Sequence, residues 1–175
     1  MIPLLDSTLV GEIAFVPPTA VAPARVLVLG IGNVLMGDEG VGVHVLRRLE
    51  REPELTDVRL LDGGTGGINL LGEFDGVEAV ILIDATRDGS PAGTFRHRII
   101  DRVADLPRGL GAHDFGLKDL FAAAAFVGRQ PDLHLCTIAV ETVHPMCTTL
   151  TPAVAAAVPG TVSWVRHLAM GLTRE

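Results

Sequence analysis

The sequence has little cysteine: Cys136 and Cys147 are the only two among 175 residues. Two cysteines exclude a disulfide framework and a four-cysteine zinc site. So small a number of cysteines fits a reducing, cytoplasmic setting. Cys136 lies inside an apolar run and is expected to be a small buried core residue. Cys147 lies near His144, but a thiol nucleophile needs a base that a third group orients, and the sequence indicates no such group.

The chain also lacks a long apolar run and a basic beginning. A membrane-spanning helix needs roughly 20 apolar residues, whereas the best stretch, 14–36, is interrupted by three prolines and by Arg25. Arg25 is the first basic residue and both charged residues before it are acidic, unlike a secretory signal. We therefore expect a cytoplasmic protein without membrane contact. Residues 1–24 are expected to form a flexible arm that is dispensable for activity, ahead of a single domain over 25–175.

Positive charge is scarce as well. The 14 lysines and arginines against 21 aspartates and glutamates give a formal net charge of −7. An acidic surface repels phosphate backbones, and no basic patch offsets it in the sequence, so nucleic acid is an unfavourable partner. With 48% hydrophobic and 20% charged residues, the chain has the composition of an ordinary globular domain.

Several catalytic and nucleotide-binding motifs are absent. No His-Glu pair occurs, which excludes a zinc peptidase of the H-E-x-x-H kind, and none of the three serines lies in G-x-S-x-G. There is no Gly-Lys-Ser/Thr of a P-loop. The segment 30–32 is Gly-Ile-Gly, as in a dinucleotide fingerprint, but Leu35 takes the place of the third glycine. Asp38 and Glu39, at the start of the next helix, would also repel a diphosphate.

Short apolar runs alternate with segments of helical spacing from Arg25 onward. They predict strands at 26–29, 58–61, 77–83, 94–100 and 133–140, and helices that begin near residues 41, 68, 117 and 152. Apolar strands separated by helices are typical of a mostly parallel sheet covered on both faces, and the less apolar run at 94–100 is expected at an edge. Thr151 and Pro152 predict the start of the last helix, which Pro159 should kink or split.

Three polar residues lie in loops where such a fold binds ligands, beyond the carboxyl ends of the strands. These residues are Glu39, Asp84 and His113. A sheet with the first and third strands side by side would place Glu39 and Asp84 on one rim. One imidazole and two carboxylates form a mixed nitrogen and oxygen site, which suits nickel, zinc, manganese or iron.

Purely structural roles for these residues remain open. Asp38 and Glu39 can complement the dipole of the helix that follows. Asp84 can begin a turn, and His113 can be a loop residue or an N-cap. Asp62 can bond the glycine-rich backbone beside it instead of a ligand.

Five segments, in order, closely resemble the motifs of the [NiFe]-hydrogenase maturation endopeptidases. They are LGIGNVLMGDEGVG at 29–42, LDGGTGG at 61–67, IDA at 83–85, HDFGL at 113–117 and LTPAV at 150–154. Together they span the chain from Arg25 to about Leu172. The segment 141–147 departs from the family's pattern after Glu141.

The resemblance implies a three-layer α/β/α sandwich of the phosphorylase/hydrolase-like kind, with a mixed, mostly parallel five-stranded sheet. It also implies that Glu39, Asp84 and His113 bind metal, as nickel that the substrate supplies. The substrate would be the precursor of the hydrogenase large subunit, from which a monomeric endopeptidase removes the C-terminal extension after nickel insertion.

The mechanism stays open at this point. A metal held by the three residues could polarise the carbonyl or position a water molecule. Alternatively, the metal could serve for recognition alone, with Asp38 or Asp62 handling protons. A function of another class also remains, that of a non-catalytic maturation chaperone that binds the metal or the precursor.

Overall fold

The structure, a computed structural model, describes residues 24–174 except 53–54, 56, 108–109 and 111–113. The elements in chain order are β1 (Val26–Ile31), the 3-10 helix η1 (Gly37–Gly40), α1 (Val41–Leu49), β2 (Val58–Gly64), the 3-10 helix η2 (Gly67–Phe74), β3 (Ala79–Thr86), β4 (Phe95–Ile100), the 3-10 helix η3 (Val103–Asp105), α2 (Asp114–Phe126), β5 (Asp132–Ala139) and α3 (Pro152–Leu172). The predicted arm lies outside the described residues except for residue 24, so its flexibility stays a prediction. Within the described ranges, no helix is both long and apolar enough to cross a bilayer.

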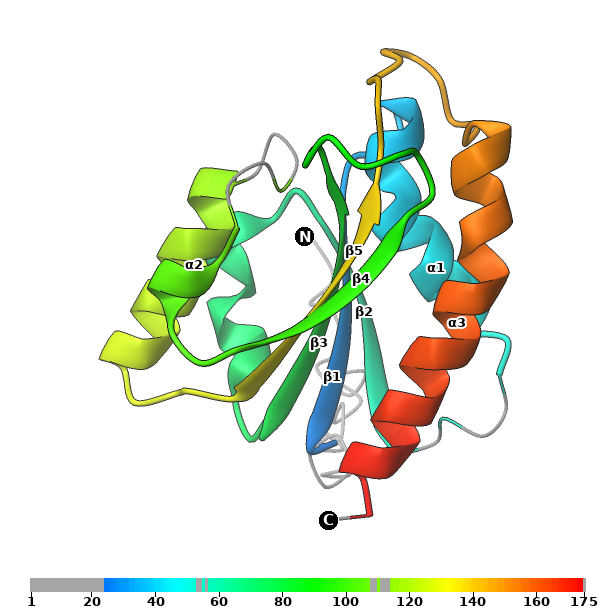
Figure 1. The fold of residues 1–175 in the computed structure, drawn as a ribbon. Coiled ribbons are helices and arrows are strands. Elements are labelled where there is room, and N and C mark those ends of the chain that lie inside the picture. Colours follow the sequence, from blue (N-terminus) through cyan, green and yellow to red (C-terminus); the bar gives the residue numbers. More distant parts are fainter. Residues whose placement is uncertain (1–23, 53–54, 56, 108–109, 111–113, 175) are drawn as a thin grey trace, which may run out of the picture.

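Five strands form one sheet in the order β2-β1-β3-β5-β4. The β1–β2, β1–β3 and β3–β5 pairs are parallel, and β4 runs antiparallel to β5 at the edge. Helices α1 and α3 cover one face of the sheet, and α2 and η2 cover the other (Figure 1). The predicted three-layer fold and the antiparallel edge strand are both confirmed.

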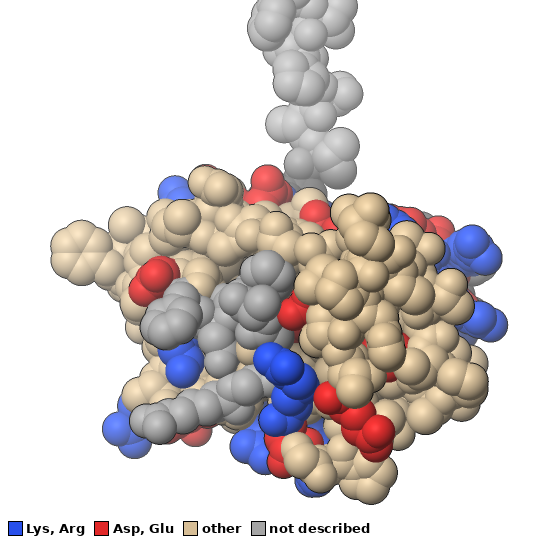
Figure 2. Space-filling model, turned by 90° about the horizontal axis from the view of Figure 1, so that it is seen from above, with Lys and Arg blue, Asp and Glu red and all other residues tan. Residues whose placement is uncertain are grey.

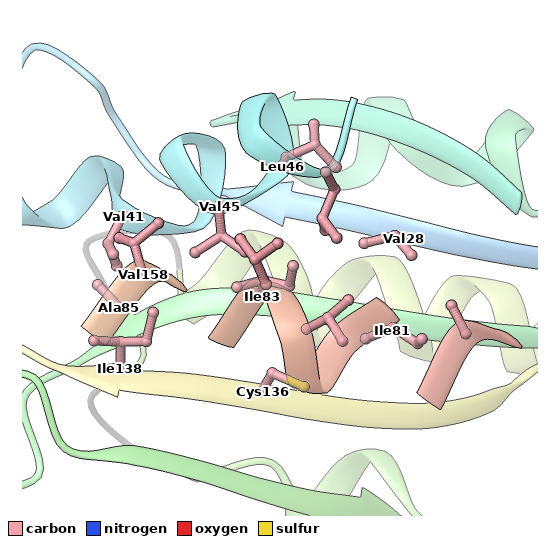
Figure 3. Packing of buried hydrophobic residues seen from close by; sticks show 14 of the residues in the cluster. Val28, Val41, Val45, Leu46, Ile81, Ile83, Ala85, Cys136, Ile138 and Val158 are labelled. Atoms are coloured by element: carbon pink, nitrogen blue, oxygen red, sulfur yellow. The ribbon is translucent and has the colours of Figure 1, made fainter. Parts of the chain in front are cut away.

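The central strands are buried on both faces, so alternate residues serve two cores. On one face, Ile81 and Ile83 of β3 pack with Val41 and Val45 of α1 and with Val158 of α3 (Figure 3). The intervening residues of β3 join the cluster beneath α2. Fully burying an aliphatic side chain contributes about 1.5–3 kcal/mol, which explains why these strands are continuous apolar runs.

Cys136 of β5 is fully buried in the core shared with α1 and α3, as expected from the sequence. Burial raises the pKa of its thiol to about 12. Such a thiol stays protonated at neutral pH and is chemically inert.

Pro159 is predicted to kink or split α3, but α3 is one continuous helix of 21 residues, so it is not split there. Proline removes the hydrogen bond to the carbonyl four residues earlier, which here belongs to Ala155. Both residues are on the exposed face, where water can satisfy that carbonyl. Val158 and Val162 on the opposite face are buried against the sheet and hold both halves of the helix on the core.

A histidine pair joins the two strands at the antiparallel edge. His97 Nε2 lies 3.2 Å from His134 Nδ1, and the His97 ring centroid lies 4.3 Å from that of Trp164 on α3. Burial lowers the pKa of both histidines, and the charge of His134 lowers that of His97 further. Asp132 opposes the shift at His134. The folded protein therefore disfavours the protonated pair.

Mild acidification should destabilise the protein through this pair. In the unfolded chain the pKa of each histidine is about 6.5. Between about pH 6.5 and the lower pKa values of the folded protein, the unfolded chain binds more protons than the folded protein does. The free energy of unfolding therefore decreases as the pH is lowered through this range. In His97→Phe, which keeps a ring against Trp164, we expect the loss in Tm between about pH 7.5 and about pH 5.5 to shrink by roughly 2–4 °C. The control, His167→Gln, removes an exposed histidine and should leave the loss unchanged; an unchanged loss in His97→Phe would contradict the assignment.

Candidate active site at the carboxyl rim of the sheet

The first motif folds into a tight corner at the carboxyl end of β1. The chain leaves β1, turns, and forms η1, which holds Asp38 and Glu39 at 1% and 4% exposure. Gly42 makes this possible, because a Cβ there would collide with the carbonyl oxygens of Ile31 and Ile83. The beginning of α1 therefore sits directly on the ends of β1 and β3.

Glu39 and Asp84 are brought to the same rim, as expected from the sequence. Glu39 lines a small hollow with Ala85, Thr86 and Arg87, the residues that follow Asp84. Asp84 is 1% exposed, and its Oδ1 accepts the amide N–H of Ala85 at 2.7 Å. Figure 2 looks down on this rim.

The position of Asp84 differs from the sequence prediction in one respect. Strand β3 continues to Thr86, so Asp84 lies within the strand and does not begin a turn. The extension pairs with β5, where Asp84 lies opposite Thr137 and Thr86 opposite Ala139. In a strand the side chains alternate, and Asp84 is in phase with Leu82, which packs in the cluster under α2.

His113 lies outside the described residues, so its expected place beside Glu39 and Asp84 stays a prediction. The described residues on either side of it reach the same part of the fold. Leu110 forms an isolated antiparallel bridge with Thr86, two residues after Asp84. Helix α2 begins at Asp114, on the face of the sheet toward which Asp84 points. Among the described residues, no group of three or more possible metal-binding side chains occurs.

Asp38 has a structural role that the sequence did not indicate. Its Oδ1 accepts the amide N–H of Thr151 at 2.7 Å, and its Oδ2 accepts the Thr151 hydroxyl at 2.8 Å. Thr151 is the N-cap of α3, as predicted, but its hydroxyl binds Asp38 and makes no capping bond. The buried carboxylate thus ties η1 to the beginning of α3, and both of its oxygens are occupied. This disfavours the hypothesis that Asp38 carries protons.

Removing this tie should destabilise the fold. Hydrogen bonds to a charged group contribute about 1.5–3 kcal/mol each and are not additive, so Asp38→Ala is expected to lower the free energy of unfolding by about 2–3 kcal/mol. Thr151→Val, which keeps the shape and loses only the hydroxyl, should cost about 1 kcal/mol. Urea denaturation of both single variants and the double variant measures the coupling; fully additive losses would show that the two residues do not act together. As a control, Asp75→Ala removes an exposed ion pair with Arg129 and should cost about 1 kcal/mol or less.

Asp62 lies on the opposite face of the sheet from Asp84. It is in phase with Leu60, which packs on the core shared with α1 and α3, whereas Asp84 points to the α2 face. Its Oδ1 accepts the amide N–H of Gly64 at 3.0 Å, and its Oδ2 lies 3.5 Å from a guanidinium nitrogen of Arg47 on α1. The alternative role, in which Asp62 bonds the glycine-rich backbone, therefore agrees with the structure. Its role in proton transfer stays a prediction.

The loops after β1 and β5 pair with each other, which sequence analysis missed. The amide N–H groups of Gly37 and Cys147 donate to the carbonyls of Cys147 and Leu35 at 2.7 and 3.1 Å, and the His144 N–H donates to Met36 at 3.3 Å. No local pattern signals this pairing, because more than 100 residues separate the two loops.

The cysteine and histidine of the second loop are engaged within that loop. His144 Nε2 lies 2.9 Å from the Thr142 hydroxyl, and the Cys147 thiol donates to the Thr149 carbonyl at 3.5 Å. Neither contact joins the thiol to the imidazole. The geometry therefore agrees with the absence of a Cys-His nucleophile.

Comparison with known proteins supports the resemblance on independent grounds. A family model described as "Hydrogenase maturation protease" matches residues 43–167. The Hydrogenase 2 maturation protease of Escherichia coli is 36% identical over 136 residues, which are 75% of this chain and 82% of that protein. The hydrogenase expression/formation protein HupD of Rhodobacter capsulatus is 43% identical over 118 residues, which are 64% of this chain and 55% of that protein. This chain thus spans about half the length of the first curated relatives that it matches.

Solved structures agree on the fold. The hydrogenase maturating endopeptidase HybD from E. coli superposes with a TM-score of 0.72 at 34% identity, covering 81% of this chain and 89% of that one. The [NiFe] hydrogenase maturation protease HybD from Thermococcus kodakarensis gives a TM-score of 0.71 at 27% identity, covering 83% and 99%. The chain belongs to the hydrogenase maturation protease family.

Proposed function

We propose that this protein is an endopeptidase that removes the C-terminal extension of a [NiFe]-hydrogenase large-subunit precursor after nickel has been inserted. Family membership supports the reaction class. The single observation that carries the proposal here is the pair of buried carboxylates, Glu39 and Asp84, on one rim of the sheet. A cytoplasmic location and a monomeric state stay predictions.

The carboxylate pair suits a cation that arrives with the substrate. Two acidic side chains on one rim attract a divalent cation. Carboxylate oxygens together with an imidazole nitrogen suit nickel. We propose that Glu39, Asp84 and His113 bind the nickel of the precursor and so position its tail on the rim.

Fewer residues then remain as candidates for proton transfer. With Asp38 bonded to Thr151 and Asp62 on the other face of the sheet, the proposal gives neither of them a chemical step. The groups that this chain offers to the reaction are Glu39, Asp84 and His113. Arg87, an exposed residue that lines the hollow beside Glu39, brings a positive charge to the same part of the rim.

A cleavage assay tests the proposal directly. The protein is mixed with a nickel-loaded large-subunit precursor, and intact-protein mass spectrometry follows the precursor. A product shortened at its C-terminus, formed with turnover, is the expected result. A stable complex without any shortening would overturn the proposal and favour the chaperone alternative.

A further inference from the structure

A basic pocket lies between α1 and α3, apart from the carboxylate pair. Its volume is about 330 Å³. One wall carries His44, Arg47, Arg48 and Arg51, from α1 and the turn that follows it. The other wall is apolar and consists of Leu150, Ala155 and Val158. The proposed reaction uses none of these side chains.

The charge of this pocket is opposite to that of the chain, which has a net charge of −7, so the expectation that no basic patch offsets the acidic surface is wrong at this place. Arg47 reaches a carboxylate, Asp62, but at 3.5 Å and with both side chains about half exposed. Within the described part of the chain, neither Arg48 nor Arg51 has a carboxylate within 4.0 Å. The pocket thus presents arginines that a negatively charged ligand can bind.

His44 provides a second, independent observation. The ring is half-buried, and its Nε2 makes no hydrogen bond of normal geometry among the described residues, although the backbone of Thr148 lies close enough to raise the pKa of the ring against the effect of burial. Unsatisfied buried polar atoms are uncommon in folded proteins and often mark a missing partner. The dipole of α1 can explain Arg47 and Arg48 in its last turn, but it does not explain an unsatisfied nitrogen beside them.

The chemistry of the pocket favours a peptide over a simple anion. Arginine binds carboxylates in a bidentate manner, and the apolar wall suits an aliphatic side chain next to the carboxylate. A peptide also offers both partners that His44 Nε2 can need: a carboxylate if the ring is protonated, and an amide N–H if it is not.

The pocket is close enough to the rim to bind the same polypeptide. His44 lies five residues after Glu39, and α1 rises about 1.5 Å per residue, so the basic wall from His44 to Arg51 is about 10 Å long. An extended peptide covers that length with about three residues. One segment of a substrate can therefore occupy the pocket while a neighbouring segment lies on the rim.

We propose that this pocket is a docking site for an acidic segment of the polypeptide on which the protein acts, separate from the bond that is cut. The identity of the partner rests on the proposed function, whereas the ligand chemistry rests on the pocket alone. The segment carries carboxylates for Arg48 and Arg51 and an aliphatic side chain for the wall of Leu150 and Val158.

A peptide-binding assay tests the ligand chemistry without any cleavage. The probe is a fluorescent hexapeptide of alternating glutamate and leucine, and the control peptide has lysine in place of glutamate. We expect the acidic peptide to bind the full chain and the lysine peptide not to bind. The double variant Arg48→Glu/Arg51→Glu should weaken binding at least about tenfold. The control variant Arg98→Glu reverses a charge on the exposed side of β4 and should leave binding unchanged. The double variant His44→Gln/Arg98→Glu, compared with Arg98→Glu alone, measures the contribution of His44 separately from that of the arginines.

Cleavage of the loaded precursor then places the site in the reaction. The arginine variant should raise KM about tenfold and leave kcat unchanged, because it removes binding remote from the bond that is cut. Equal binding of the two peptides, displacement of the acidic peptide by inorganic phosphate at equal concentration, or an unchanged affinity in the arginine variant would overturn the docking site. If peptide binding follows the expectation but no precursor is cleaved, the docking site stands and the proposed function fails.

Discussion

Neutralising either buried carboxylate, by Glu39→Gln or Asp84→Asn, should abolish cleavage of the nickel-loaded precursor. Changes to residues that merely support a metal ligand already cost about 10–100-fold, so loss of a ligand itself is expected to lower kcat/KM by at least about 100-fold. Both substitutions keep the size of the side chain and remove its charge, so the fold should survive. His113→Ala is expected to have the same effect on cleavage. The measurement is the initial rate of precursor shortening, followed by mass spectrometry.

The stability of the same variants provides a second readout. Glu39 and Asp84 are nearly fully buried on one rim, and the carboxamide of each variant keeps the size of the side chain that it replaces. We therefore expect the Tm of each variant to stay within a few degrees of that of the wild type, so that the loss of cleavage does not reflect unfolding. Glu50→Gln, at the exposed end of α1, is the matched control and should change neither activity nor Tm. If Glu39→Gln or Asp84→Asn retains more than about a tenth of the wild-type rate, the result would contradict the metal-binding assignment.

The second large effect concerns nickel on the precursor. A site with only three protein ligands, two of them carboxylates, should hold a free ion weakly compared with a closed four-ligand site. A loaded precursor brings nickel that its own side chains already hold, so it contacts this protein both through the metal and through its polypeptide. Only a precursor that makes both kinds of contact has the full binding energy available for cleavage. We expect the purified protein to contain little metal, and we expect the nickel-free precursor to be cleaved at least about 100-fold more slowly than the loaded one.

Both precursor forms are compared in one gel assay to test this dependence. Free nickel added to the nickel-free precursor is the control for simple activation of the protein by the ion. Metal analysis of the purified protein checks the weak binding. Cleavage of the nickel-free precursor at the loaded rate, in the presence of a chelator, would refute the dependence and indicate an ordinary endopeptidase.

The fold was predictable because its strands are short apolar runs. Burial on both faces leaves a continuous hydrophobic pattern at 26–29 and 77–83, and the more polar run at 94–100 correctly indicated the edge strand. The failures arise where distant residues override local preference. The packed face of α3 keeps the helix continuous through Pro159, and pairing with β5 extends β3 beyond Asp84.

The candidate site was predictable in part, for similar reasons. Glu39 and Asp84 share a rim because β1 and β3 are neighbours, which the strand order confirms. The bond between Asp38 and Thr151 joins residues 113 positions apart, so no local pattern could reveal it. Strand alternation alone does not say on which face of the sheet Asp62 lies. The face is known only after the structure shows which helices cover each side.

The hydrogen bonds between the loops after β1 and β5 have a consequence for the entropy of binding. Gly37, His144 and Cys147 are fixed by main-chain bonds before any partner arrives, and Asp38 ties the same corner to α3. A partner that binds here therefore does not have to order the protein, and the conformational entropy lost on association falls on the partner's own tail. Amide protons of Gly37 and Cys147 should accordingly exchange slowly with solvent in the free protein. The affinity for different precursors then depends on how much conformational entropy each C-terminal tail loses when it binds at the rim.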